Sequence, residues 1–167
     1  MRAPRARRGA MGPHKPRVGF GAKPRLSTKM RNRALAADFV HRAEVRLRAI
    51  DVLFEGESWA DVVRESQETV ELALKGLLRA SGIDAPRVHD VSPVLLAEKH
   101  RLPTKLEARV EELAAISRDL RRDRELAFYG AEDLTPSTFY SRDDAMRALD
   151  GARLTVSTVK PFVTDPG

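Results

Sequence analysis

Apolar residues at steps of three and four, sustained over long stretches, constrain this chain more than any other feature. In residues 34–54 they are Leu35, Phe39, Ala43, Leu47, Ile50 and Phe54. In residues 59–80 they are Val62, Val63, Val70, Ala73, Leu74, Leu77 and Leu78. Such spacing places side chains on one face of an α-helix. The pattern therefore predicts two long amphipathic helices over these ranges.

Three more helices are expected further along the chain. A short helix begins near Ser92 and ends before Pro103, a longer one covers 104–128, and the last runs from Ser141 to Pro161. Ser58 and Ser141 each precede an aspartate by three residues, an acidic variant of the capping box. No convincing strand is found. These features predict an all-α, up-and-down bundle of about five helices.

The composition agrees with one helical core. The 167 residues include six Phe, two Tyr and one Trp, so the core volume must come from Leu, Val, Ile and Ala. A chain of this length supports one core and hardly two. We expect a single domain over 34–163, with tails at 1–33 and 164–167.

The positive charge is concentrated in the first tail. Residues 1–33 contain 11 Lys or Arg and no acid, so the other 134 residues carry 30 − 11 = 19 basic against 24 acidic side chains, or −5. Without apolar periodicity, the tail is expected to be disordered. It could be an arm that contacts phosphates, an organelle-targeting segment, or a result of start-codon choice, with Met30 or Met11 as the true start. We favour the last interpretation.

Several functional classes are excluded or disfavoured. The chain has no Cys, which excludes disulfides, thiol catalysis and thiolate metal sites. Its four His never fall at i, i+4 spacing, so neither a metal nor another cofactor is expected. No apolar run approaches the roughly 18 residues of a membrane span. With no secretory signal pattern, a cytoplasmic location is the default expectation.

Two segments together resemble a known family. The first carries Gln67, Glu71 and Lys75, followed by Gly82, Pro86 and the pair His89-Asp90. The second is an Arg-rich helix end, then Tyr129-Gly130, then an aromatic residue before the last helix. Their order and spacing resemble the HEPN domain family of prokaryotes, in particular the type associated with nucleotidyltransferases.

The resemblance implies a dimeric helical bundle, often encoded beside a minimal nucleotidyltransferase with which it acts as a pair. Some members are endoribonucleases of toxin–antitoxin systems and use an Arg-x(4–6)-His motif across the dimer interface. Others carry a tyrosine that the partner transferase modifies with AMP. For this chain, the resemblance makes Tyr129 the candidate AMP acceptor.

The ribonuclease motif is incomplete in this sequence. With Arg122 as the motif arginine, the histidine position is Ala127; with Arg124, it is Tyr129. A general base with a pKa near 7 suits RNA cleavage, whereas tyrosine has a pKa near 10. Whether the chain is an enzyme stays open, and the missing histidine favours a non-catalytic role.

The polar face of the 104–128 helix supplies the candidate ligand-binding residues. Arg118, Arg122, Glu125 and Tyr129 are spaced to form one stripe opposite the apolar face. They could bind a phosphate-bearing ligand or a partner chain. Alternatively, the stripe is a solvated face with local ion pairs such as Arg121–Glu125. Arg124 projects nearer the apolar sector, where it could pair with a buried group or join the site.

Two further polar groups have alternative interpretations. Gln67, Glu71 and Lys75 share one helix face, either as a surface Glu71–Lys75 pair or as a polar network that contacts the 104–128 helix or its ligand. His89-Asp90 precedes the short helix, where Asp90 or Ser92 is expected to cap free N–H groups.

Three functions follow, in order of preference. The first is a HEPN-type nucleotide- or RNA-binding protein that acts with a minimal nucleotidyltransferase in a toxin–antitoxin-like pair. The second is an endoribonuclease with a non-standard site built from Arg122, Arg124, Glu125 and Tyr129. The third is a helical oligomerisation module without a nucleotide ligand.

Overall fold

The structure is a computed structural model that describes the backbone of residues 27–129 and 136–164, and the side chains of 27–122 and 138–164. The helices are α1 (Thr28–Glu55), α2 (Trp59–Ala80), α3 (Ser92–Ala97), α4 (Val110–Tyr129), α5 (Pro136–Phe139) and α6 (Arg142–Thr164), with 3-10 turns at Lys99–Arg101 and Thr104–Arg109. No strand occurs in these ranges. The predicted all-α class is confirmed.

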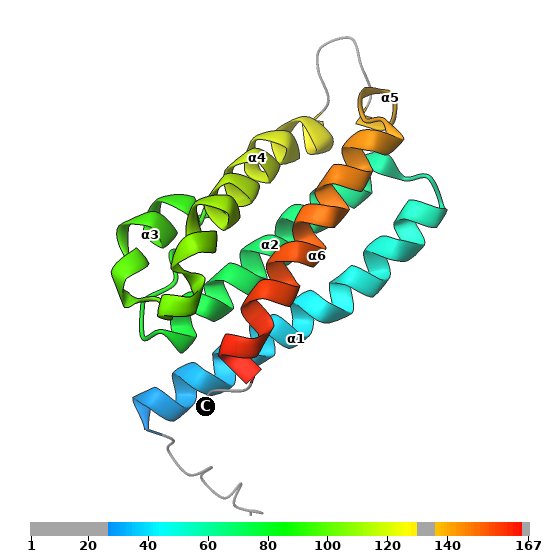
Figure 1. Ribbon diagram of the computed structural model, residues 1–167. Coiled ribbons are helices and arrows are strands. Elements are labelled where there is room, and N and C mark those ends of the chain that lie inside the picture. Colours follow the sequence, from blue (N-terminus) through cyan, green and yellow to red (C-terminus); the bar gives the residue numbers. More distant parts are fainter. Residues whose placement is uncertain (1–26, 130–135, 165–167) are drawn as a thin grey trace, which may run out of the picture.

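The long helices α1, α2, α4 and α6 alternate in direction along the bundle (Figure 1). Helix α2 is central and packs against α1, α4 and α6. The short helix α3 packs beside α4. The α1–α2 connection, the end of α4 and the start of α6 lie at one end of the bundle, and the start of α1 lies at the other (Figure 1). This is the up-and-down arrangement that the sequence predicted.

Aliphatic side chains fill the core, as the low aromatic content required. Leu74, Leu77, Leu95 and Leu113 are fully buried. At Gly76 an added Cβ would lie 3.1 Å from both the Ala36 carbonyl oxygen and Val40 Cγ2, so a glycine allows α1 and α2 to approach this closely. None of the described helices is long and apolar enough to cross a membrane.

Helix α1 begins earlier than the apolar pattern predicted. It starts at Thr28 rather than Ala34, with the Ser27 hydroxyl accepting a hydrogen bond from the Met30 amide at 3.3 Å. Leu35, expected on the buried stripe, is 38% exposed because Ala36 and Val40 face the core instead. Part of the expected tail is therefore helical, while residues 1–26 lie outside the described residues.

The two expected capping boxes have different outcomes. Ser141 and Asp144 form one: the Asp144 amide donates to Ser141 Oγ at 3.2 Å, and the Ser141 amide donates to Asp144 Oδ2 at 2.9 Å. Ser58 does not, because its hydroxyl donates to Asp61 Oδ2 at 2.6 Å and accepts no backbone amide. The capping box predicted at Ser58 was therefore wrong, and the Ser58 and Asp61 side chains bond to each other instead.

Three other helix boundaries also differ from expectation. The segment predicted as helix from 104 begins with the 3-10 turn Thr104–Arg109. The single turn α5 was not expected. Helix α6 continues through Pro161 to Thr164, where the Thr164 hydroxyl donates to the Lys160 carbonyl at 3.0 Å. Proline removes one helical hydrogen bond and crowds the carbonyl four residues earlier, yet α6 continues for three residues beyond it.

Candidate functional site

A cavity of about 250 Å³ lies between α4 and α6. Its walls are Ile116, Asp119, Leu120 and Arg122 from α4, and Asp144, Arg147, Ala148 and Gly151 from α6. We call it the α4–α6 cleft. Two guanidiniums and two carboxylates surround an apolar base, which suits a ligand with both an anionic and an apolar part.

The first turn of α6 positions Asp144, one of the two carboxylates that line the cleft. Hydrogen bonds from the Ser141 hydroxyl and amide, aided by Arg147, hold the pKa of the Asp144 carboxyl below its usual value. Arg147 also forms an ion pair with Asp144. Asp144 is therefore ionised at neutral pH, and its contact with Arg147 orients that guanidinium toward the cleft rim.

The structure locates two of the five candidate ligand-binding residues. Arg118 and Arg122 are both exposed on α4, whereas Leu113 and Leu120 are buried on its other side. Of this pair, Arg122 lines the α4–α6 cleft and Arg118 does not. The other three candidates, Arg124, Glu125 and Tyr129, have side chains outside the described residues, and so does the expected Arg121–Glu125 pair.

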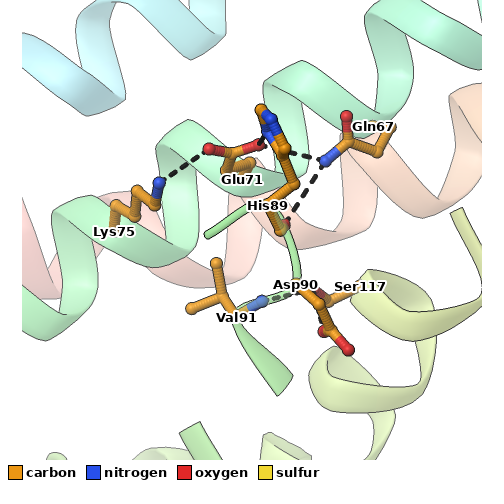
Figure 2. A network of polar contacts seen from close by, with 7 residues as sticks. All are labelled: Gln67, Glu71, Lys75, His89, Asp90, Val91 and Ser117. Carbon is orange, nitrogen blue, oxygen red and sulfur yellow. Dashed lines mark hydrogen bonds and ion pairs between the residues drawn. The ribbon is translucent and has the colours of Figure 1, made fainter. Parts of the chain in front are cut away.

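The opposite side of α4 faces a buried polar network centred on Glu71 (Figure 2). This carboxylate is 9% exposed. Lys75 Nζ donates to its Oε1 at 2.7 Å, Gln67 Nε2 donates to its Oε2 at 3.1 Å, and His89 Nδ1 lies 3.0 Å from the same Oε2. The expected Glu71–Lys75 pair is present but largely buried rather than on the surface, and Gln67 and His89 extend it into a polar network.

The network joins three parts of the fold. Gln67 Nε2 also reaches the His89 carbonyl at 3.5 Å. Asp90 Oδ1 accepts the Ser92 amide at 2.9 Å, the predicted cap of α3. The Ser117 hydroxyl of α4 lies 3.5 Å from Asp90 Oδ1, and the Val91 amide donates to that hydroxyl at 3.4 Å. Helix α2, the segment before α3, and α4 are thus held in register (Figure 2).

Glu71 is ionised despite its burial. Burial raises the pKa of its carboxyl, but hydrogen bonds from Lys75, His89 and Gln67, together with the Lys75 charge, bring that pKa below its ordinary value of 4.5. The His89 side chain is 49% exposed, so one ring edge meets the carboxylate while much of the ring faces solvent. A carboxylate at Nδ1 fixes the orientation of an imidazole.

The same region contains a group of metal-type donors that the sequence analysis missed. One donor atom each from Glu68, Glu71 and His89 lies within 4.8 Å of the others. Histidine spacing along one helix could not reveal this group, because His89 lies in a different segment from the two glutamates. The Lys75 ammonium already neutralises Glu71 at 2.7 Å, which weakens the attraction of the group for a cation.

Fold and site together define a class: a small helical bundle with a buried polar network on one side of an Arg-rich helix and a charged cleft on the other. The profile of the HEPN domain matches residues 36–161, most of the chain. The chain belongs to the HEPN domain family. Comparisons with curated proteins and with solved structures give no match.

Proposed function

We propose that this HEPN domain binds a nucleotide or RNA phosphate at the α4–α6 cleft. The observation that carries the proposal is the position of Arg122, which lines the cleft opposite Arg147 of α6. Guanidinium groups bind phosphate oxygens through paired N–H donors. Helix α4 continues from Arg122 toward Tyr129, so the remaining candidates Arg124, Glu125 and Tyr129 follow on the same helix.

Binding of a nucleotide panel and a short RNA to the full chain tests this proposal. Arg122→Ala should weaken saturable binding by about tenfold or more, the usual contribution of a hydrogen bond to a charged group. Arg48→Ala, an exposed arginine on α1, is the matched control and should bind as the wild type does. Equal affinities for wild type and Arg122→Ala would contradict a ligand site in the cleft.

We further propose that the domain acts with a minimal nucleotidyltransferase in a toxin–antitoxin-like pair, as a homodimer in the cytoplasm, and that Tyr129 accepts AMP from the partner enzyme. The family membership and the Tyr129-Gly130 sequence support this. Co-expression with a transferase encoded beside the gene should add the mass of one AMP group to the wild type and not to Tyr129→Phe. An unmodified wild type that fails to co-purify with that transferase would count against the pairing.

A further inference from the structure

A second cavity, of about 640 Å³, lies where α1 begins and α2 ends. Thr28, Lys29, Asn32 and Arg33 of α1 and Arg79 and Ser81 from the end of α2 line it. We call it the basal cavity. The start of α1 is at the opposite end of the bundle from the first turn of α6, which lines the α4–α6 cleft (Figure 1). The basal cavity is therefore separate from the site proposed above.

The charged side chains described around the basal cavity are all positive. Of its described lining residues, Lys29, Arg33 and Arg79 are basic and none is acidic. Within the described part of the chain these three side chains make no ion pair, and Arg79 Nε is buried without a hydrogen-bond partner. Some other basic residues of the bundle have carboxylate partners, as Lys75 has Glu71 and Lys160 has Glu44. The sequence before α1 contains no acid that could neutralise the cavity.

The backbone around the basal cavity also favours an anion. Thr28 and Lys29 are the first residues of α1, whose N–H groups have no acceptor within the helix and carry the positive end of its dipole. Three carbonyl groups in the last turn of α2 are already engaged: those of Leu77, Leu78 and Arg79 accept the amides of residues 81, 83 and 82. Gly82 adopts a φ of 71°, the left-handed conformation that lets the chain turn back at the end of α2 and form these hydrogen bonds.

We propose that the basal cavity binds a pyrophosphate-type group, either as free pyrophosphate or as the phosphate chain of a nucleoside di- or triphosphate. Three cations and two helix-terminal amides match the several negative charges of such a group. Among the lining residues that the structure describes, none is an aromatic on which a base could stack. The cavity thus recognises the phosphates rather than the base, independently of Arg122.

Calorimetric titration of the full chain with pyrophosphate, ATP and inorganic sulfate tests the proposal. Arg33 is exposed, so Arg33→Gln should fold normally and weaken pyrophosphate binding by about tenfold or more. Arg79→Gln should have a similar effect, provided that circular dichroism shows a folded protein. Arg48→Gln, on the exposed part of α1, should retain wild-type affinity.

The outcomes separate the ligand sources and the two sites. Equal affinities for pyrophosphate and ATP identify the phosphates alone as the ligand, whereas tighter ATP binding, still lost in Arg33→Gln, identifies a nucleotide. No saturable binding at millimolar pyrophosphate would overturn the proposal. So would unchanged affinity in Arg33→Gln, whether it is measured in the wild type or in an Arg122→Ala background. Binding of RNA but not of pyrophosphate through Arg33 would also overturn it.

Discussion

The two sides of α4 use charge in opposite ways. On the α2 side, Glu71 is buried among Lys75, Gln67 and His89 at hydrogen-bonding distances. On the α6 side, Arg122 is exposed and borders a cavity. The polar residues of α2 that carry much of the family resemblance therefore stabilise the bundle. Arg122, by contrast, is exposed to solvent at the cavity, where we propose that a ligand binds.

Glu71→Gln should have the largest effect on stability. It leaves the Lys75 ammonium, whose side chain is 14% exposed, without its carboxylate. We expect the free energy of unfolding to fall by about 3 kcal/mol, as when a buried ion pair is broken. Asp51→Asn, which breaks the exposed pair with Arg153, should cost about 0–1 kcal/mol.

Urea denaturation of the two variants checks this difference. If Glu71→Gln were no more destabilising than Asp51→Asn, the network would not be a structural element. The contrast between the two sides of α4 would then be lost.

Protonation of Glu71 should contribute to the acid destabilisation of the fold. The pKa of Glu71 is lower in the folded protein than its ordinary 4.5, so the unfolded chain takes up this proton more readily. The contribution of Glu71 is therefore complete above about pH 4.5 and is lost as pH falls through the lower folded pKa. Thermal unfolding from pH 7 to pH 3 should show a steeper acid loss for the wild type than for Glu71→Gln. Parallel curves would mean that Glu71 has the same pKa in both states.

The sequence predicted helices well and contacts between helices poorly. Periodicity located α2 because Leu74, Leu77 and Leu78 all face the core. It missed residues 28–33, where the helix is stabilised by the Ser27 cap and by good helix formers such as Lys29 and Arg31 rather than by an apolar face.

The sites were harder to predict because they depend on packing. Glu71 and His89 are 18 residues apart and meet only after α2 and the segment before α3 pack together. Arg122 and Arg147 become neighbours in the same way, when α4 and α6 form the cleft. The exposed side of α4 needed only helical geometry, so Arg118 and Arg122 could be identified from their spacing.

Capping provides a smaller test at the edge of the cleft. Ser141→Ala removes the hydroxyl that accepts the Asp144 amide, and an N-cap loss of this kind costs about 1 kcal/mol. Ser58→Ala should cost much less, because Ser58 Oγ caps no amide. Chemical denaturation would measure both, and equal losses would contradict the assignment of Ser141 as the cap. Loss of the cap should also weaken ligand binding at the cleft. Asp144 and Arg147 both line the cleft, and Asp144, which lies in the turn that Ser141 caps, pairs with Arg147.

The smallest expected effect is that of adding a methyl group at Gly151. Gly151 lines the cleft, and an added Cβ would lie 3.2 Å from Ile116 Cγ2, a side-chain atom that can move slightly. Alanine is a better helix former than glycine by about 1 kcal/mol, so Gly151→Ala should raise the free energy of unfolding by about 0.5 kcal/mol. Gly76→Ala should lower it by about 1–3 kcal/mol, the cost of overpacking, because its Cβ would meet the backbone oxygen of Ala36 at 3.1 Å. A destabilised Gly151→Ala would mean that α4 and α6 are as tightly packed as α1 and α2, leaving little room for a ligand beside Arg122.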